Sequence, residues 1–227
     1  MLGGNEVGII LLSLKVALVA VALSLPAAIA MAYVLARCDF PGRMLLDALV
    51  HLPLVLPPVV VGFALLVLFG AHGPIGAFLE RWFGIVLVFR WTGAALAAAI
   101  MGFPLMVRAI RLSFSAIDRR FETVARTLGA SRVSVFFSVT LPLALPGLAT
   151  GAVLSFARSL GEFGATITFV SNIPGETQTI PLAIYAFTQV PGGDASAWRL
   201  SAIAVALSLG ALVAAEWAAR RARSEPA

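Results

Sequence analysis

The chain alternates between long apolar stretches and short polar ones, and the lengths of the apolar stretches predict its secondary structure. A helix that crosses about 30 Å of hydrocarbon at about 1.5 Å per residue needs roughly 20 apolar residues. The stretches that meet this length are 8–36, 44–69, 91–112, 145–169 and 199–219. We therefore expect an all-α integral membrane protein with five transmembrane helices, in a transmembrane domain over 8–219 that is followed by a cytoplasmic tail over 220–227.

Two further apolar pieces, 85–89 and 180–187, are too short to cross a bilayer. Backbone polar groups at membrane depth have to be hydrogen-bonded within the protein. We therefore expect each piece to form an interfacial or re-entrant helix outside the main spans.

The composition excludes an ordinary soluble domain. Hydrophobic residues make up 60% of the 227 residues and charged residues 12%, whereas soluble domains average about 45–50% and about 25%. With a mean hydropathy of +1.00, the chain has more apolar surface than one aqueous core can bury, so a lipid bilayer is its expected solvent. The net charge of +5 then indicates arginine-rich cytoplasmic flanks rather than a nucleic-acid partner.

The arginines are unevenly distributed between the two sides of the predicted spans. With the N-terminus outside, the inner segments hold Arg37, Arg43, Arg108, Arg111, Arg119, Arg120, Arg126, Arg132, Arg220, Arg221 and Arg223. The outer segments hold Arg81, Arg90 and Arg199. Because basic residues are enriched on the cytoplasmic side of membrane proteins, this asymmetry predicts an outer N-terminus and an inner C-terminus.

The sequence lacks the residue sets of a metal site and of an ATPase. Its single cysteine, Cys38, and its two histidines, His51 and His72, have no partner at ligand spacing, so we expect no bound metal. A phosphate-binding loop needs Gly-x4-Gly-Lys-Ser/Thr, and the one lysine, Lys15, lies in the first span without flanking glycines. We therefore expect a protein that is not an enzyme and that binds no cofactor itself.

Prolines interrupt the second predicted span at Pro53, Pro57 and Pro58. Each removes a helix hydrogen-bond donor, so the span is expected to be kinked or broken. Such a kink can serve packing alone, or it can give a transport pathway a deformable wall. The clustering favours the second interpretation, which makes these prolines candidate pathway residues.

Polar side chains gather near one face of the fourth predicted span, at Ser155, Arg158, Ser159 and Glu162. Ionisable groups at membrane depth cost at least about 2.5–3.5 kcal/mol each, so they rarely face lipid. Arg158 and Glu162 can neutralise each other as a structural pair, or they can line the pathway or an interface. The sequence leaves both interpretations open.

The polar segment 118–142, between the third and fourth spans, carries an apolar stripe made of Phe121, Val124, Ala125 and Leu128. The spacing i, i+3, i+4, i+7 predicts a short helix, and Gly129 suits its end. Ser131 can cap a second short helix over 133–139, which Pro142 is expected to close. The product would be two angled helices against the inner membrane face, with an apolar surface that needs a partner.

This segment resembles the cytoplasmic loop of bacterial ATP-binding-cassette (ABC) importer permeases, which follows the pattern E-A-A, three residues, G, nine residues, I-x-L-P. The matching positions are Ala125, Gly129, Val139, Leu141 and Pro142. The chain departs at the start, where Thr123 and Val124 stand and the acidic residue is one place earlier, at Glu122. The alternative interpretation is an amphipathic loop that lies on lipid headgroups.

The resemblance implies a type I ABC importer permease fold and a transport subunit whose partner ATPase binds ATP and Mg²⁺. It also implies that the loop docks on that ATPase through coupling helices containing Glu122, Thr123, Ala125, Leu128, Gly129, Ser131, Val139, Leu141 and Pro142. A homodimer is implied as well, since five spans enclose little alone. A secondary transporter driven by an ion gradient is the competing class, but Glu162 is its only candidate carboxylate and no internal repeat is visible.

Two further segments are similar to the tetrahedral-oxyanion branch of this family, and most of all to molybdate permease subunits. They are 159–166, Ser-Leu-Gly-Glu-Phe-Gly-Ala-Thr, and 172–179, Asn-Ile-Pro-Gly-Glu-Thr-Gln-Thr. Sulfate/thiosulfate permeases share the Gly-Glu-Phe/Tyr-Gly part and remain the close alternative. The resemblance implies import of an oxyanion, molybdate first, across a bacterial cytoplasmic (inner) membrane by alternating access, after delivery by an external or periplasmic molybdate-binding protein.

Overall fold

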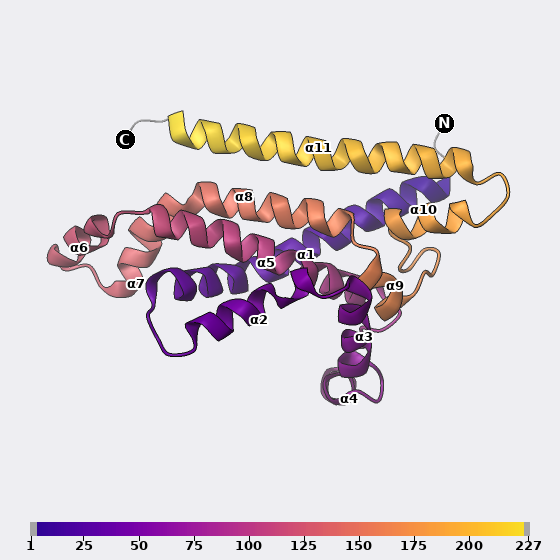
Figure 1. Cartoon of the computed structure of the whole chain (residues 1–227), viewed down its shortest axis with the longest axis horizontal. Helices are drawn as coiled ribbons and strands as arrows, with labels where there is room; N and C mark the ends of the chain where they lie inside the picture. The colour runs from indigo at the N-terminus through magenta and orange to yellow at the C-terminus, as the bar shows by residue number, and fades with distance from the viewer. Residues whose placement is uncertain (1–3, 225–227) are drawn as a thin grey trace.

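Long helices lie side by side along the length of the molecule (Figure 1), as the apolar stretches predict. The computed structural model describes the backbone of residues 4–224 and the side chains of residues 5–214. Its long helices are α1 (Gly4–Arg37), α5 (Trp91–Ala116), α8 (Leu141–Leu160) and α11 (Asp194–Ser224). The shorter elements are α2 (Arg43–Val55), α3 (Pro58–Phe69), α4 (Pro74–Phe83), α6 (Arg119–Thr127), α7 (Arg132–Val135), the π-helical turn η1 (Phe136–Thr140), α9 (Gly164–Val170) and α10 (Ile180–Thr188). No strand occurs within the described residues, so the all-α prediction is confirmed.

Four helical segments of the described chain are long and apolar enough to cross a membrane: Asn5–Arg37, Trp91–Ala116, Arg132–Leu160 and Asp194–Ala214. The second predicted span forms two helices, α2 and α3, which meet the same criteria together and are bent by 110°. Counting this bent pair as one span gives five. The protein is therefore a multi-pass membrane protein, while its inside–outside orientation stays a prediction.

The bend in the second span lies where prolines remove hydrogen-bond donors. Leu56 ends α2 with the extended backbone angles φ −70° and ψ 143°. Pro57 precedes α3, and Pro58 is its first residue, where a missing N–H costs nothing. Pro53 lies inside α2 without ending it. The predicted interruption is confirmed, and it lies at Pro57.

Both predicted bounds of the fourth span, 145–169, are wrong. Its helix begins earlier, at Arg132, and ends at Leu160. Residues 161–163 leave the helix, and α9 starts separately at Gly164. Hydropathy carries no sign of this break, because its cause is a side-chain cap from Glu162 that is described below.

The two short apolar pieces have different structures. The piece 180–187 is helical and forms most of α10, as expected. The piece 85–89 is not helical, contrary to the prediction. Gly84 ends α4 in the left-handed conformation, with φ 65°, and Phe89 also has a positive φ of 59°. Two such residues five positions apart leave no room for a helical turn.

The predicted end of the last span at 219 lies inside α11, whose helical backbone extends to Ser224. The predicted tail, 220–227, is therefore helical as far as Ser224. Its side chains, and all of residues 225–227, lie outside the described residues.

Helix α5 packs closely on α8 because small residues let the two backbones approach. A Cβ atom added at Gly102 of α5 would lie 2.4 Å from Oγ of Ser155 on α8. Likewise, a Cβ added at Gly147 of α8 would lie 2.2 Å from Cβ of Ser113 on α5. These contacts hold the centre of the bundle together along two helical turns or more.

The first and last helices are joined at one end of the molecule, where α11 begins beside the start of α1 (Figure 1). Nη2 of Arg199 on α11 lies 2.6 Å from Oε1 of Glu6 on α1. About two turns further along α1, Ser13 Oγ accepts the backbone N–H of Ile180, the first residue of α10, at 2.8 Å. The N-terminal helix therefore fixes both α10 and α11.

Candidate functional site

The loop between α5 and α8 is built from two capped helices. Asp118 precedes α6, and its Oδ1 accepts the N–H of Arg120 at 2.9 Å. Gly129 follows α6 with φ 89°, the left-handed conformation typical of a helix end. Ser131 precedes α7, and its Oγ accepts the N–H of Ser134 at 3.2 Å. Both the helix stop at Gly129 and the cap at Ser131 are as the sequence predicts.

The second helix of the loop is not a separate element, contrary to the prediction. It continues from α7 through η1 into α8, so that Arg132–Leu160 is one helix. Pro142 therefore does not close it but lies in the first turn of α8. Within η1 the N–H of Leu141 donates to the carbonyl of Phe136, five residues back. This wider turn lets the helix continue past a proline that has no N–H.

The loop carries exposed apolar side chains at one end of the molecule, where Figure 1 shows α6 and α7 on the far side from α9 and α10. On α6, Phe121 and Val124 are each 58% exposed and Leu128 is 84% exposed. Val133 of α7 and Phe137 of η1 are exposed as well. We call these five side chains the apolar surface of the loop. A polar loop that presents such a surface needs a partner to cover it.

A single carboxylate fastens α6 to the bundle. Oε1 of Glu122 lies 3.1 Å from Nη2 of Arg37, at the end of α1. The same oxygen accepts a hydrogen bond from Oγ1 of Thr140 in η1, at 3.1 Å. Arg37 Nη2 also donates to the carbonyl of Ile117, just before α6. The acidic residue that departs from the family pattern by one position is therefore the anchor of the loop.

Aromatic rings packed edge to face hold the other half of the loop. The ring of Phe136 in η1 lies 5.1 Å from that of Tyr33 on α1, edge to face. Tyr33 in turn packs edge to face on Phe114 of α5, at 5.7 Å. With one polar and one aromatic attachment, the two helices of the loop are rigidly coupled to α1 and α5.

The remaining motif positions divide between the loop surface and the bundle. Thr123 is exposed, and its Oγ1 donates to the carbonyl of Arg119 within α6. Leu141 packs against the buried cluster around Phe114. The half-buried positions are Ala125 and Val139, and Pro142 is exposed. Sequence reasoning missed Arg37 and Thr140, although an arginine that ends the first span on the predicted inner side was a usable signal.

The two broken spans meet each other. A Cβ atom added at Gly164, the first residue of α9, would lie 2.7 Å from Cβ of Pro58, the first residue of α3. One turn further on, a Cβ added at Gly62 would lie 2.5 Å from the backbone oxygen of Ala165. Helices α3 and α9 therefore touch backbone to backbone, next to both breaks.

Replacing Gly62 by alanine is expected to push α3 away from α9, because the added methyl group meets backbone atoms that cannot rotate aside. Overpacking of this kind costs about 1–3 kcal/mol. We expect a lower thermal unfolding midpoint of the detergent-solubilised protein. Gly210→Ala on α11 is the matched control, since nothing lies within 4 Å of a Cβ added there. Equal midpoints for the two variants would contradict the close contact.

The predicted pair of Arg158 and Glu162 forms at this junction. Nη1 of Arg158 lies 2.7 Å from Oε2 of Glu162, whose side chain is 2% exposed. The other oxygen, Oε1, accepts the backbone N–H of Ala165 at 2.8 Å. Glu162 therefore caps α9 while it neutralises Arg158, which explains why the helix breaks at this point.

Ser155 and Ser159 are buried on the side of α8 that faces α5. Oγ of Ser159 donates to the carbonyl of Ala98 at 3.5 Å. Ser155 is fully buried, and within the described residues its Oγ has no hydrogen-bond partner. Of the four polar residues predicted on this helix, Arg158 is therefore the one whose side chain is partly accessible.

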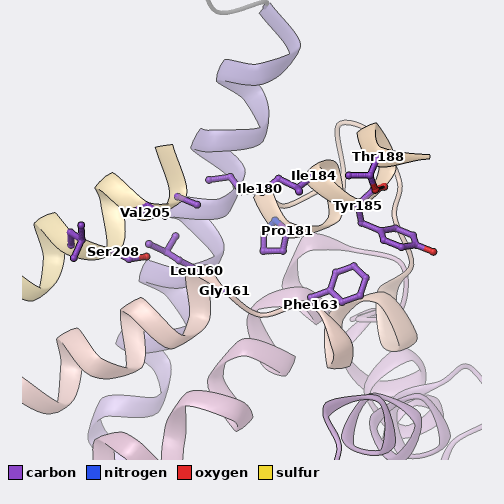
Figure 2. A pocket seen from close by; sticks show the side chains of 12 residues that line it. Leu160, Gly161, Phe163, Ile180, Pro181, Ile184, Tyr185, Thr188, Val205 and Ser208 are labelled. Atoms are coloured by element: carbon purple, nitrogen blue, oxygen red, sulfur yellow. Dashed lines mark hydrogen bonds between the residues drawn. The ribbon is translucent and has the colours of Figure 1, made fainter. Parts of the chain in front are cut away.

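Two of the large cavities between the helices have linings that are almost entirely apolar. One, of about 710 Å³, lies between α1, α2 and α5 and includes Pro53 in its wall. The other, of about 680 Å³, lies between the end of α8, α10 and α11. Figure 2 shows the rings of Phe163 and Tyr185 closing one side of it, with centroids 5.3 Å apart. Neither lining contains a charged residue, so neither cavity suits an anion.

Known proteins share both the sequence and the fold of this chain. Residues 17–224 match the family described as "Binding-protein-dependent transport system inner membrane component". The molybdenum transport system permease protein ModB of Escherichia coli K12 is 61% identical over 94% of this chain and 93% of its own. The ModB protein of Haemophilus influenzae is 56% identical over 95% and 94%.

A permease chain in the crystal structure of a bacterial alginate ABC transporter, solved in complex with an alginate pentasaccharide-bound periplasmic protein, superposes with a TM-score of 0.76. That chain is 16% identical in sequence, and the match covers 99% of this chain and 82% of the other. The likeness shows the type I ABC importer permease fold. The chain therefore belongs to the family of binding-protein-dependent transport system inner membrane components.

Proposed function

We propose that this chain is the permease subunit of an ATP-driven importer that moves molybdate across the bacterial inner membrane. The observation that carries the proposal is the loop between α5 and α8, which presents an exposed apolar surface and is rigidly anchored to α1 through Glu122. Relatives of matching length with 61% and 56% identity are molybdenum permeases. The proposal that the substrate is molybdate is taken from these relatives.

The anchored loop suits a role in coupling. A cytoplasmic ATPase that holds the apolar surface of the loop would move α6, and the contacts of Glu122 and Phe136 would pass that movement to α1 and α5 as a rigid-body motion. ATP and Mg²⁺ would be bound by the ATPase and not by this chain. Two copies of the permease would enclose the pathway between them, and an external molybdate-binding protein would deliver the oxyanion to the outer face.

The candidate pathway residues lie at or near two neighbouring interruptions, the one between α2 and α3 and the one between α8 and α9, which we call the paired breaks. They would act by letting the helices bend there. Pro57 and Pro58 end one helix and start another where they meet α9, and Pro53 borders the cavity between α1, α2 and α5. Junctions of this kind can bend without unfolding the long helices. Arg158, which is paired with Glu162, is the partly accessible basic side chain beside them.

The test is uptake of radiolabelled molybdate into a strain that lacks its own transporter and that expresses this chain with its ATPase and binding protein. We expect radiolabelled molybdate to be taken up. We also expect unlabelled tungstate to inhibit this uptake more strongly than unlabelled sulfate does. Purification of the tagged chain should also recover the ATPase. Stronger competition by sulfate would assign the chain to sulfate/thiosulfate import, and uptake that survives ATP depletion under an ion gradient would identify a secondary transporter.

A further inference from the structure

A smaller cavity, unlike the two apolar ones, is lined mostly by charged and polar side chains. It has a volume of about 420 Å³, lies between α2 and α5, and is lined by Asp47, His51, Arg108, Arg111, Leu112 and Ser115. It lies toward the end of the bundle that carries the loop, because α5 ends at Ala116, just before α6. None of these residues belongs to the docking loop or to the paired breaks.

Most of the charged groups around this cavity already have partners. Nη1 of Arg111 lies 2.7 Å from Oδ1 of Asp47. Nδ1 of His51 lies 2.8 Å from the carbonyl oxygen of Asp47 and 3.3 Å from its Oδ1. Arg108 differs from them: among the described residues its guanidinium makes no hydrogen bond or ion pair, and it is exposed.

The position of Arg108 makes its unpaired charge informative. It lies eight residues before the end of α5, which corresponds to about 12 Å along a helix that spans the membrane. An arginine at that depth rarely faces lipid, because a charged group without a partner is costly there. The side chain is therefore expected to face a water-filled space; it lines the polar cavity and also borders a cavity of about 670 Å³ between α5 and α8.

The lining selects an anion of a particular shape. The lining contains two arginines and one aspartate, so the cavity carries an excess of positive charge before any ligand enters. The five N–H donors of Arg108 are all available to planar pairs of oxygens, and the hydroxyl of Ser115 adds another donor. With one water molecule taking about 30 Å³, the cavity accommodates a small tetrahedral oxyanion and part of its hydration shell.

We propose that this cavity is an oxyanion-binding site near the inner end of the permease, with Arg108 as its main ligand and Ser115 as a second donor. The inference deepens the proposed function and rests on it: the transported oxyanion would pause on Arg108 before it leaves toward the cytoplasm. A phosphate group of an anionic lipid offers the same tetrahedral chemistry, so the experiment has to distinguish these two sources.

The experiment uses the complete complex of permease and ATPase in nanodiscs that contain phosphatidylglycerol. Arg108→Gln removes the charge, Arg108→Lys keeps the charge without the planar donors, and Arg81→Gln on the exposed surface of α4 is the matched control. Three quantities are measured for each: tungstate binding to the nucleotide-free complex, the amount of ATPase that co-purifies, and the amount of phosphatidylglycerol that remains bound after detergent washing.

We expect Arg108→Gln to bind tungstate at least about tenfold more weakly, since a charge-assisted hydrogen bond is lost. Arg108→Lys should fall between the wild type and the glutamine variant, while Arg81→Gln and the yield of ATPase stay unchanged. Wild-type tungstate binding in Arg108→Gln would overturn the site and leave the proposed function intact. Loss of bound phosphatidylglycerol with unchanged tungstate binding would assign the cavity to a lipid headgroup instead. Failure of the wild-type chain to recover ATPase would overturn the proposed function, and this inference with it.

Discussion

A Gly129→Val variant is expected to insert into the membrane normally and to lose its ATPase. Gly129 has φ 89°, and an L-residue in the left-handed region costs about 1–2 kcal/mol, with a β-branched side chain at the upper end. A Cβ atom added there would meet nothing within 4 Å, so the effect comes from the backbone and not from crowding. The turn between α6 and α7 would open, and the apolar surface of the loop would lose its shape.

The measurement is the amount of ATPase that co-purifies, together with ATP-dependent molybdate uptake. We expect both to fall about tenfold or more, because about 1.4 kcal/mol corresponds to a factor of ten. Gly42→Val is the matched control: Gly42 has φ 90° and open space around an added Cβ, but it lies between α1 and α2. If Gly129→Val recovers ATPase as well as Gly42→Val does, the loop is not the docking element.

The sequence predicted the long helices and the caps of the loop because both depend on local features. Runs of about 20 apolar residues specify a span without reference to the rest of the fold. Gly129 and Ser131 act on their nearest neighbours, through a positive φ and a hydrogen bond three residues away. Features of this kind can be recognised in a single sequence.

Two features of the loop could not be predicted from its motif. Glu122 belongs to the predicted docking loop, and its carboxylate is bound by Arg37 and Thr140, both distant in the sequence, so it anchors the loop to the bundle. Pro142 was expected to end a helix, but the π-helical turn before it lets the helix continue past a residue that has no N–H. The first feature depends on distant partners, and the second depends on a rare type of helical turn.

The polar cavity at Arg108 shows the same limit. Its lining combines residues of α2 and α5 that lie about sixty positions apart, and only the packing of these helices shows that Arg111 is paired with Asp47. In the sequence analysis, Arg108 and Arg111 served only as basic residues that indicate the cytoplasmic side of the spans. The structure distinguishes the guanidinium of Arg111, which is paired, from that of Arg108, which is exposed and can bind a ligand.

Glu162→Ala is expected to destabilise the protein more than any other single change at the paired breaks. It leaves Arg158 without its counter-ion and the N–H of Ala165 without its acceptor. Removing one partner of a buried ion pair costs about 3–5 kcal/mol, and Glu162 is 2% exposed. We expect a large drop in the thermal unfolding midpoint in detergent and loss of uptake. Glu162→Gln should be milder, because its amide oxygen can still accept the N–H of Ala165.

The charge-swapped double variant, Arg158→Glu with Glu162→Arg, separates the two interpretations that the sequence left open. A simple ion pair would recover both stability and uptake in the swap. The structure predicts no recovery, because an arginine at position 162 has no acceptor for the N–H of Ala165 and α9 loses its cap. Full recovery would therefore contradict the capping role. Arg158→Gln, at a partly accessible side chain, completes the set: normal stability with lost uptake would place Arg158 on the pathway, whereas a parallel loss of both would make it a structural partner of Glu162.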